Sequence, residues 1–273
     1  MSFATPLRML IKLLLVAFSV LLSSMAARRF GHAVGGTLGG LPMIAGPIAG
    51  FVLLASGVQT TQAIALATLV CLPATAMHLT AFAWAALRWR WPAALLTANF
   101  AFFALGLRLP LWPLAAWQTC LLVVLVLALG HRAMPAARGL ATAVHIPNLE
   151  LLLRVIVAMA LAWLIIETAG VVPAAVSGLL LAVPITGNVL PCFTLPRHGG
   201  DATVMLLRGF LRGQVGFAVF FATLLWSLDY LHAGLAYAAA WAAALAVARA
   251  LYSWRLYRGP SLTWGVRFVL IGV

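Results

Sequence analysis

The chain has 273 residues, of which 65% are hydrophobic and 8% are charged, and its 17 Lys and Arg outnumber its 4 Asp and Glu to give a net charge of +13. A soluble domain carries charge on about a quarter of its residues, so this composition excludes that class. Apolar runs that approach the roughly 20 residues needed to cross a bilayer recur along the chain. They predict an all-α, polytopic membrane protein and not a β-barrel, whose segments alternate over about 10 residues.

Hydropathy and the charge breaks divide the chain into about nine predicted spans. They are residues 9–27, 33–56, 61–86, 92–107, 111–130, 150–167, 171–193, 203–227 and 232–253. Arg8, Lys12 and the apolar run after them could also indicate a cleaved signal peptide. We favour a retained helix, because this segment aligns with an internal span. Ser261–Val273 is too short to cross and is expected to be a truncated tenth span or an interfacial helix.

Arginines in the connections predict the orientation of the spans. Each odd-numbered predicted span is followed by one or two of them: Arg28 and Arg29, Arg88 and Arg90, Arg132 and Arg138, Arg197, and Arg255 and Arg258. The opposite side carries only Arg8, Lys12 and Arg108. Because arginine-bearing short loops are typical of the cytoplasmic side, we expect the N-terminus outside and the C-terminus in the cytoplasm. This dispersal of the charge argues against nucleic-acid binding.

A weak internal duplication relates the two parts of the chain. Lys12–Met43 aligns with Arg154–Ile185 at a constant separation, equal to the number of residues from Lys12 to Arg154 and here called the repeat offset. The alignment depends on shared Gly and Pro positions. With one residue deleted after Met43, the alignment sets Ala45-Gly46-Pro47 against Thr186-Gly187-Asn188. It divides one membrane domain into residues 1–140, with five spans, and residues 141–273, with about four spans and the C-terminal segment.

The loop charges change sides between the two copies. Arg28-Arg29 corresponds to the uncharged Gly170-Val171, and Arg88-Trp89-Arg90 corresponds to Tyr230-Leu231-His232. Since the first half holds an odd number of spans, the second half enters the membrane upside down. The sequence therefore predicts an inverted repeat of 5 plus 4–5 spans, the build of many secondary transporters. An accidental match between helical hairpins is the alternative.

Gly and Pro interrupt the predicted second span of each half. Gly allows close helix approach, and Pro removes a backbone donor from the helix. Interrupted spans at matching places in two halves are the best sequence indication of a binding site near the membrane midplane. The candidate substrate-binding residues here are Pro42, Gly46, Pro47, Pro184, Thr186, Gly187 and Asn188. The alternative is a packing face of small residues with a proline kink.

Polar residues within the predicted spans add further candidates. Arg208 and Arg212 share one helical face, with Gln214 near them, and two guanidiniums would suit an anionic group. The alternative for both arginines is that their side chains extend to the headgroups without a ligand. His78 lies well inside the third span and is a candidate proton relay, although a lone histidine also serves to bond a neighbouring helix.

Signatures of enzymes, metals and cofactors are absent from the sequence. It contains no GxSxG, HExxH or Walker motif, and Cys71, Cys120 and Cys192 lie within spans without CxxC spacing. We therefore expect no enzyme activity, no metal and no cofactor. The expected partners are the lipid bilayer and a small anionic solute or lipid headgroup, and a homo-oligomer is left open.

The second half also carries a family resemblance. The Pro-interrupted run Leu181–Pro184, the polar loop Arg197–Asp201 and the long span ending near Trp226 are similar to the GlpM-type bacterial inner-membrane proteins. Those are small four-helix units linked in some bacteria with exopolysaccharide production, and no binding residues carry over from them. The resemblance implies a bacterial inner-membrane protein built from duplicated small units.

Two functions are consistent with these patterns. The expected function is a transporter-like carrier for a small anionic or amphipathic substrate. The alternative is a non-transporting membrane scaffold or assembly factor, for example in envelope or exopolysaccharide production. A channel is disfavoured, because no ring of repeated polar residues is visible.

Overall fold

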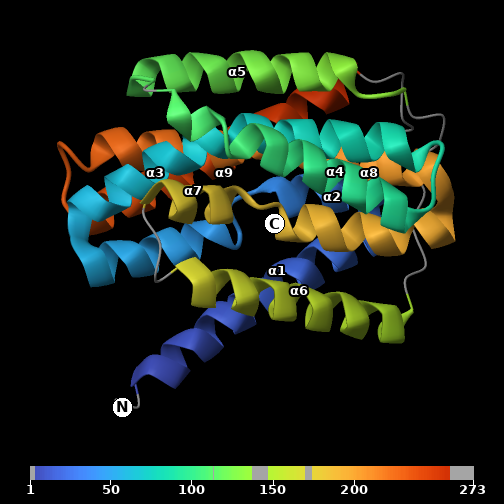
Figure 1. Cartoon of the computed structure of the whole chain (residues 1–273), viewed down its shortest axis with the longest axis horizontal. Coiled ribbons are helices and arrows are strands. Elements are labelled where there is room, and N and C mark those ends of the chain that lie inside the picture. Colours follow the sequence, from blue (N-terminus) through green and yellow to red (C-terminus); the bar gives the residue numbers. More distant parts are fainter. Residues whose placement is uncertain (1–3, 113, 137–146, 170–173, 259–273) are drawn as a thin grey trace.

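The computed structural model describes residues 4–112, 114–136, 147–169 and 174–258, which are helical apart from short turns (Figure 1). The elements are α1 (Ala4–Phe30), α2 (His32–Gly40), α3 (Ala45–Ala86), α4 (Trp91–Gly106), the 3-10 helix η1 (Leu109–Leu111), α5 (Ala116–Ala133), α6 (Asn148–Ala169), α7 (Ala174–Ala182), α8 (Ile185–Ser227) and α9 (Ala233–Arg258). No strand occurs in these ranges, so the predicted all-α class is confirmed. The C-terminal segment Ser261–Val273 lies outside the described residues.

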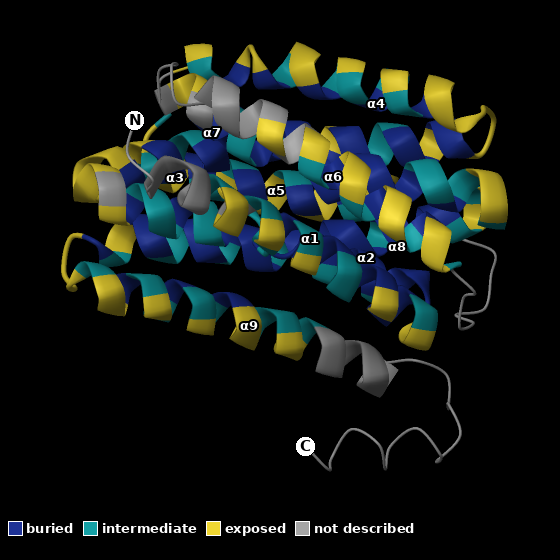
Figure 2. Ribbon diagram, turned by 90° about the horizontal axis from the view of Figure 1, so that it is seen from below, coloured by how far each residue is buried: buried dark blue, intermediate teal, exposed yellow. Residues whose placement is uncertain are grey.

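Several of the helices have the length and composition of membrane spans. Within the described residues, 7 segments are long and apolar enough to cross a bilayer. They are Met9–Phe30, His32–Leu54, Ser56–Ala86, Trp91–Leu111, Ala116–Ala133, Gly178–Ser227 and Ala233–Leu251. Large apolar side chains on the outer helices point outward, such as Phe100 of α4, which is 77% exposed, and Val124 of α5, which is 67% exposed. Together with these long apolar segments, such surfaces support a multi-pass membrane protein, in which lipid covers the outer helices; Figure 2 shows exposed residues along α4.

The longest helices, α3 and α8, form the centre of the bundle. The short helix α2 packs on α8, and the short helix α7 packs on α3. α1 and α6 pack against each other on one side, while α4 and α9 cover the outer faces of α3 and α8 (Figure 1). α5 lies outside α3 and α8. The main buried cluster is therefore made largely by α3 and α8, with small residues of α4 and α9 packed onto it.

Both central helices reverse direction at a glycine. Gly57 in α3 has φ 80° and ψ −176°, and Gly199 in α8 has φ 78° and ψ −179°. This region of backbone space is open to glycine and strongly disfavoured for other residues. Figure 1 shows the two reversals at opposite ends of the molecule, that of α3 on the left and that of α8 on the right. Gly57 and Gly199 are separated by the repeat offset, as the predicted repeat requires of two equivalent turns.

The backbone around the helix breaks repeats at the same separation. Each of three backbone hydrogen bonds has a counterpart one repeat offset later in the chain. The bond from Leu41 N to Leu38 O and that from Val183 N to Leu180 O are both 3.2 Å long, and the bond from Gly46 N to Pro42 O and that from Asn188 N to Pro184 O are both 2.7 Å long. The bond from Trp89 N to Ala85 O and that from Leu231 N to Ser227 O are both 2.8 Å long. No residue is missing between the first pair and the last. These hydrogen bonds favour an alignment without the deletion after Met43, in which Gly46 is set against Asn188.

Candidate functional site

Two short helices end inside the bundle at matching places. α2 ends at Gly40 and α3 begins at Ala45, whereas α7 ends at Ala182 and α8 begins at Ile185. Pro42 and Pro184 follow the two ends and have no N–H to continue the helical ladder. The predicted interruption of the span is thus present twice. Each interruption frees backbone carbonyls that must find other partners inside the bundle.

One freed carbonyl at each break accepts a hydrogen bond from a side chain of the other half of the chain. The donor belongs to α8 at the first break and to α3 at the second. Nε2 of Gln214, which is 3% exposed, donates a hydrogen bond of 3.2 Å to the carbonyl oxygen of Gly40. Oγ1 of Thr75 donates one of 2.8 Å to the carbonyl oxygen of Ala182, so here too the donor and the acceptor belong to different halves. Gly40 and Ala182 are equivalent at the repeat offset. Gln214, predicted as a substrate contact, therefore has a structural role at the first break.

Glycines allow α2 and α8 to touch through their backbones. A Cβ on any of four glycines would overlap a carbonyl oxygen of the facing helix: Gly36 with Leu206, Gly40 with Phe210, Gly209 with Ala33, and Gly213 with Thr37. The two helices thus meet through Gly-x-x-x-Gly faces. The packing interpretation of the glycine-rich segment is correct for α2. At the other break, a Cβ on Gly178 would lie 2.8 Å from the backbone nitrogen of Thr68 in α3.

Residues of both breaks converge on Phe210 of α8. A Cβ on Gly39 would lie 3.4 Å from the Phe210 ring and 3.5 Å from Cγ2 of Thr186, and a Cβ on Gly187 would lie 3.4 Å from the same ring. The structure therefore brings Thr186 and Gly187 next to the end of α2. Gly46 lies elsewhere, because its carbonyl accepts a 3.2 Å hydrogen bond from the Tyr237 hydroxyl of α9.

The remaining predicted break residues have various degrees of burial. Pro42, Pro184 and Asn188 are buried, and Pro47 is partly buried. The side-chain oxygen of Asn188 has no hydrogen-bond partner among the described residues. The same holds for Oε1 of Gln214. Buried polar atoms are normally paired, so these groups are suited to hold water or a polar ligand.

His78 is fully buried in α3. Its ring centroid lies 6.2 Å from that of Phe82 and 6.3 Å from that of Phe102. The imidazole is also near the backbone of Gly187 and Ala98. It thus has aromatic rings on two sides and lies beside Gly187 of the second break.

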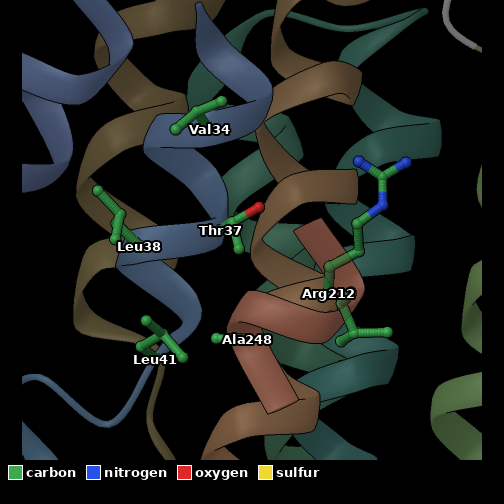
Figure 3. Close-up of a pocket in the computed structure, with 7 residues that line it drawn as sticks. Val34, Thr37, Leu38, Leu41, Arg212 and Ala248 are labelled. Atoms are coloured by element: carbon green, nitrogen blue, oxygen red, sulfur yellow. The ribbon is translucent and has the colours of Figure 1, made fainter. Parts of the chain in front are cut away.

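Arg212 lines a cavity of about 160 Å³ beside the first break (Figure 3). The lining residues are Val34, Thr37, Leu38, Leu41, Arg212, Ala248 and Leu251. In Figure 3 the guanidinium extends away from Val34 and Leu38, so the cavity wall is mainly apolar. Small-molecule sites usually enclose about 300 Å³ or more, which makes this cavity small for a solute in the conformation observed.

Arg208 is engaged by another helix. Its Nη2 donates a hydrogen bond of 3.1 Å to the carbonyl oxygen of Met134, directly after α5. Nε1 of Trp84 donates one of 2.8 Å to the carbonyl oxygen of Ala133. A cation at a helix C-terminus satisfies free carbonyls and the helix dipole. Arg208 therefore fixes the end of α5.

Sequence reasoning did not single out a group of charged residues on α6 and α8. Glu150, 2% exposed, lies in the first turn of α6, where it pairs with Arg154 and with Arg197 of α8. The signal was available, because Glu150 and Arg154 have the i,i+4 spacing of a helical ion pair. It was missed because Arg197 belongs to a distant segment, and because span ends usually carry solvated charges.

Comparisons of the chain with models of protein families, with curated proteins and with solved structures find no match. Among the described residues, no three His, Cys, Asp or Glu side chains are grouped to hold a metal ion. The groups that the candidate site offers are the two helix ends, the buried amides of Asn188 and Gln214, the imidazole of His78 and the guanidinium of Arg212.

Proposed function

We propose that the protein is a transporter-like carrier of the inner bacterial membrane for a small anionic or amphipathic substrate. The observation that carries the proposal is the meeting of two interrupted helices, one from each half, at Phe210. In inverted-repeat transporters, discontinuous helices at corresponding places form the substrate and ion sites. Buried, unpartnered polar atoms of Asn188 and Gln214, and the buried imidazole of His78 beside Gly187, belong to or adjoin the two breaks.

About nine crossings of the bilayer are part of this proposal. The candidate span Gly178–Ser227 has 50 residues, and a straight helix of that length would reach about 75 Å, over twice the hydrocarbon thickness. The reversal at Gly199 divides it into two crossings of ordinary length. α6 has 22 residues, or about 33 Å of helix, and supplies a further crossing.

An inverted relation of the two halves is supported by contacts near a common axis. Residues close to a two-fold axis contact their own equivalents. Val16 of α1 and Ala158 of α6, which are equivalent at the repeat offset, belong to one buried cluster, and the equivalent pair Leu13 and Val155 both pack against it. The glycine reversals at opposite ends of the molecule fit the same axis.

Charge favours one orientation in the membrane. The end of the molecule at which α3 ends and α8 reverses carries the exposed arginines of the connections there: Arg29, Arg88, Arg90, Arg132 and Arg197. We assign this end to the cytoplasm, with the N-terminus outside, because basic residues accumulate in cytoplasmic loops. The similarity to GlpM-type proteins remains a prediction consistent with this location.

In this proposal Arg212, which lines the cavity beside the first break, would attract the anionic part of a substrate. Arg208 acts at a distance, since its contact with Met134 holds α5 in place. Movement of one half against the other would enlarge the small cavity beside Leu41. A scaffold or assembly factor is the second candidate, favoured by the glycine contact between α2 and α8, which makes that interface close-packed.

Topology reporters test the inverted architecture. A reporter inserted after Val58 and another after Gly200 follow the two equivalent reversals. We expect the first on the outer side and the second on the cytoplasmic side of the membrane. Reporters on the same side would refute the inverted repeat and leave the scaffold as the better proposal.

Transport is tested separately in proteoliposomes. Currents on a solid-supported membrane are recorded for inorganic phosphate and for mono- and dicarboxylates, with Arg212→Leu as the test variant and Arg88→Leu as its control. Both substitutions remove one arginine, and Arg88 is exposed in the turn after α3. A current that Arg212→Leu abolishes and Arg88→Leu retains supports an anion carrier. Equal currents in both variants would remove Arg212 from the site, and no current above that of empty liposomes favours the scaffold.

A further inference from the structure

A buried carboxylate joins two helices at the arginine-bearing end of the molecule. Oε1 of Glu150 accepts a hydrogen bond of 3.0 Å from Nε of Arg154, one turn later in α6. Oε2 of Glu150 lies 2.8 Å from Nε of Arg197, near the end of the first segment of α8. The side chain of Glu150 is 1% exposed and that of Arg197 is 51% exposed. The carboxylate is thus shielded from solvent, and one of its two cations reaches the surface.

Polar and aromatic groups extend this contact to α1 and α2. Nη2 of Arg28, at the end of α1, donates a hydrogen bond of 2.9 Å to Oδ1 of Asn148 at the start of α6. The rings of His32 in α2 and His198 in α8 are 5.0 Å apart. The start of α6 is therefore tied both to α1 and to α8, whereas further along the helix Val155 and Ala158 pack in an apolar cluster.

The sequence of the first half does not repeat this group of charges. The positions one repeat offset before Glu150, Arg154 and Arg197 are Arg8, Lys12 and Ala55, and two cations and an alanine cannot form the same ion pair. The charge pattern of this contact is therefore not part of the pattern that the two halves share.

We propose that Glu150, Arg154 and Arg197 form a clasp that keeps α6 closed against α8 at the arginine-bearing end, and that its release exposes the apolar interface behind it. The clasp concerns how α6 is held and does not depend on transport. Arg154 keeps Glu150 compatible with burial, because a buried carboxylate needs a paired charge. Arg197 is the part that can separate, since its guanidinium already reaches solvent.

Cysteine labelling tests the clasp. In a background with Cys71, Cys120 and Cys192 replaced by alanine, the reporter is Val189→Cys, a buried position of α8 in the same apolar cluster as Ala158 of α6. A second reporter, Val70→Cys, lies in a different buried cluster. The rate of reaction with a membrane-impermeant maleimide is measured on purified full-length protein in detergent.

We expect Arg197→Gln to raise the labelling rate at position 189 about tenfold, the change that about 1.4 kcal/mol produces. Arg197→Lys, which keeps a cation, should retain a rate close to that of the background. Arg88→Gln removes an exposed arginine of the same end and should change neither reporter. A rate at position 189 that stays within about twofold in Arg197→Gln would overturn the clasp. An equal rise at positions 70 and 189 would also overturn it, because it would indicate general loosening of the fold.

Discussion

The glycine contact between α2 and α8 predicts a large effect from one methyl group. In Gly213→Ala the added Cβ would lie 2.7 Å from Cα of Gly40 and would overlap the carbonyl oxygen of Thr37. Carbon atoms pack at about 3.5–4.0 Å, so the helices must separate by roughly 1 Å. Forced expansion of a packed core costs about 1–3 kcal/mol. We therefore expect Gly213→Ala to destabilise the protein by about 2 kcal/mol.

Gly234 of α9 provides the matched control. A Cβ at Gly234 meets no atom within 4 Å, so Gly234→Ala adds the same methyl group without a clash. Replacing glycine in a helix usually stabilises by up to about 1 kcal/mol. Thermal unfolding of the two variants in detergent, followed by tryptophan fluorescence, should show a lower Tm for Gly213→Ala only. The expected decrease is about 4–8 °C for a chain of this size.

The double variant Gly40→Ala with Gly213→Ala decides whether the two glycines share one contact. Each methyl group pushes the same two helices apart, so the second should cost less than it does alone. The combined loss is then smaller than the sum of the single losses. Additive losses would show that the sites act independently. A Tm for Gly213→Ala that is equal to that of Gly234→Ala would refute the close approach itself.

Two further substitutions test contacts that hold the breaks and the outer helix. Thr75→Val leaves the buried carbonyl of Ala182 without a donor and should lower the free energy of unfolding by about 1–3 kcal/mol. The control, Thr97→Val on α4, loses only a hydrogen bond to the carbonyl of Ala93 in its own helix and should lower it far less. Equal losses on thermal unfolding would contradict the capping role of Thr75. Arg208→Met keeps the apolar stem and removes the donor at the end of α5, so we expect a loss of about 1–2 kcal/mol, checked by faster proteolysis of the segment after α5. Unchanged proteolysis would argue against that contact.

The course of the chain was largely predictable from composition and local patterns. Glycine and proline positions indicated both helix breaks, because the backbone chemistry of these residues is local. The reversals at Gly57 and Gly199 fall within connections that the sequence predicts, between residues 56 and 61 and between residues 193 and 203, but no pattern identified the glycine as the turning residue. A glycine within an apolar run gives the same sequence signal whether it reverses the chain or permits close packing. The distinction depends on the neighbouring helix, which the sequence does not place.

The site was predictable only in part, for the same reason. Thr186 and Gly187 were predicted as site residues, and the structure places them beside Phe210, which no sequence pattern indicated. Gln214 and Arg208 were interpreted as contacts for a ligand, but they donate hydrogen bonds to carbonyls at Gly40 and Met134. Both roles depend on helices far away in the sequence, and a polar side chain within a span does not reveal which partner it meets.

The features that the two halves share differ in kind from those that they do not share. The shared features are glycine reversals, proline breaks and helix ends whose carbonyls accept a side-chain hydrogen bond, as Gly40 does from Gln214 and Ala182 does from Thr75. Such hydrogen bonds are needed because a backbone polar group inside a membrane must find a partner within the protein. Charged groups follow another rule: Glu150 and Arg212 have no charged equivalent of the same sign in the first half. A symmetric scaffold needs none of these charges to fold. Selection for the direction of transport, for ligand binding or for orientation in the bilayer acts through groups that make one end of the molecule different from the other. We therefore expect variants at the unshared charges to change function without a comparable loss of stability.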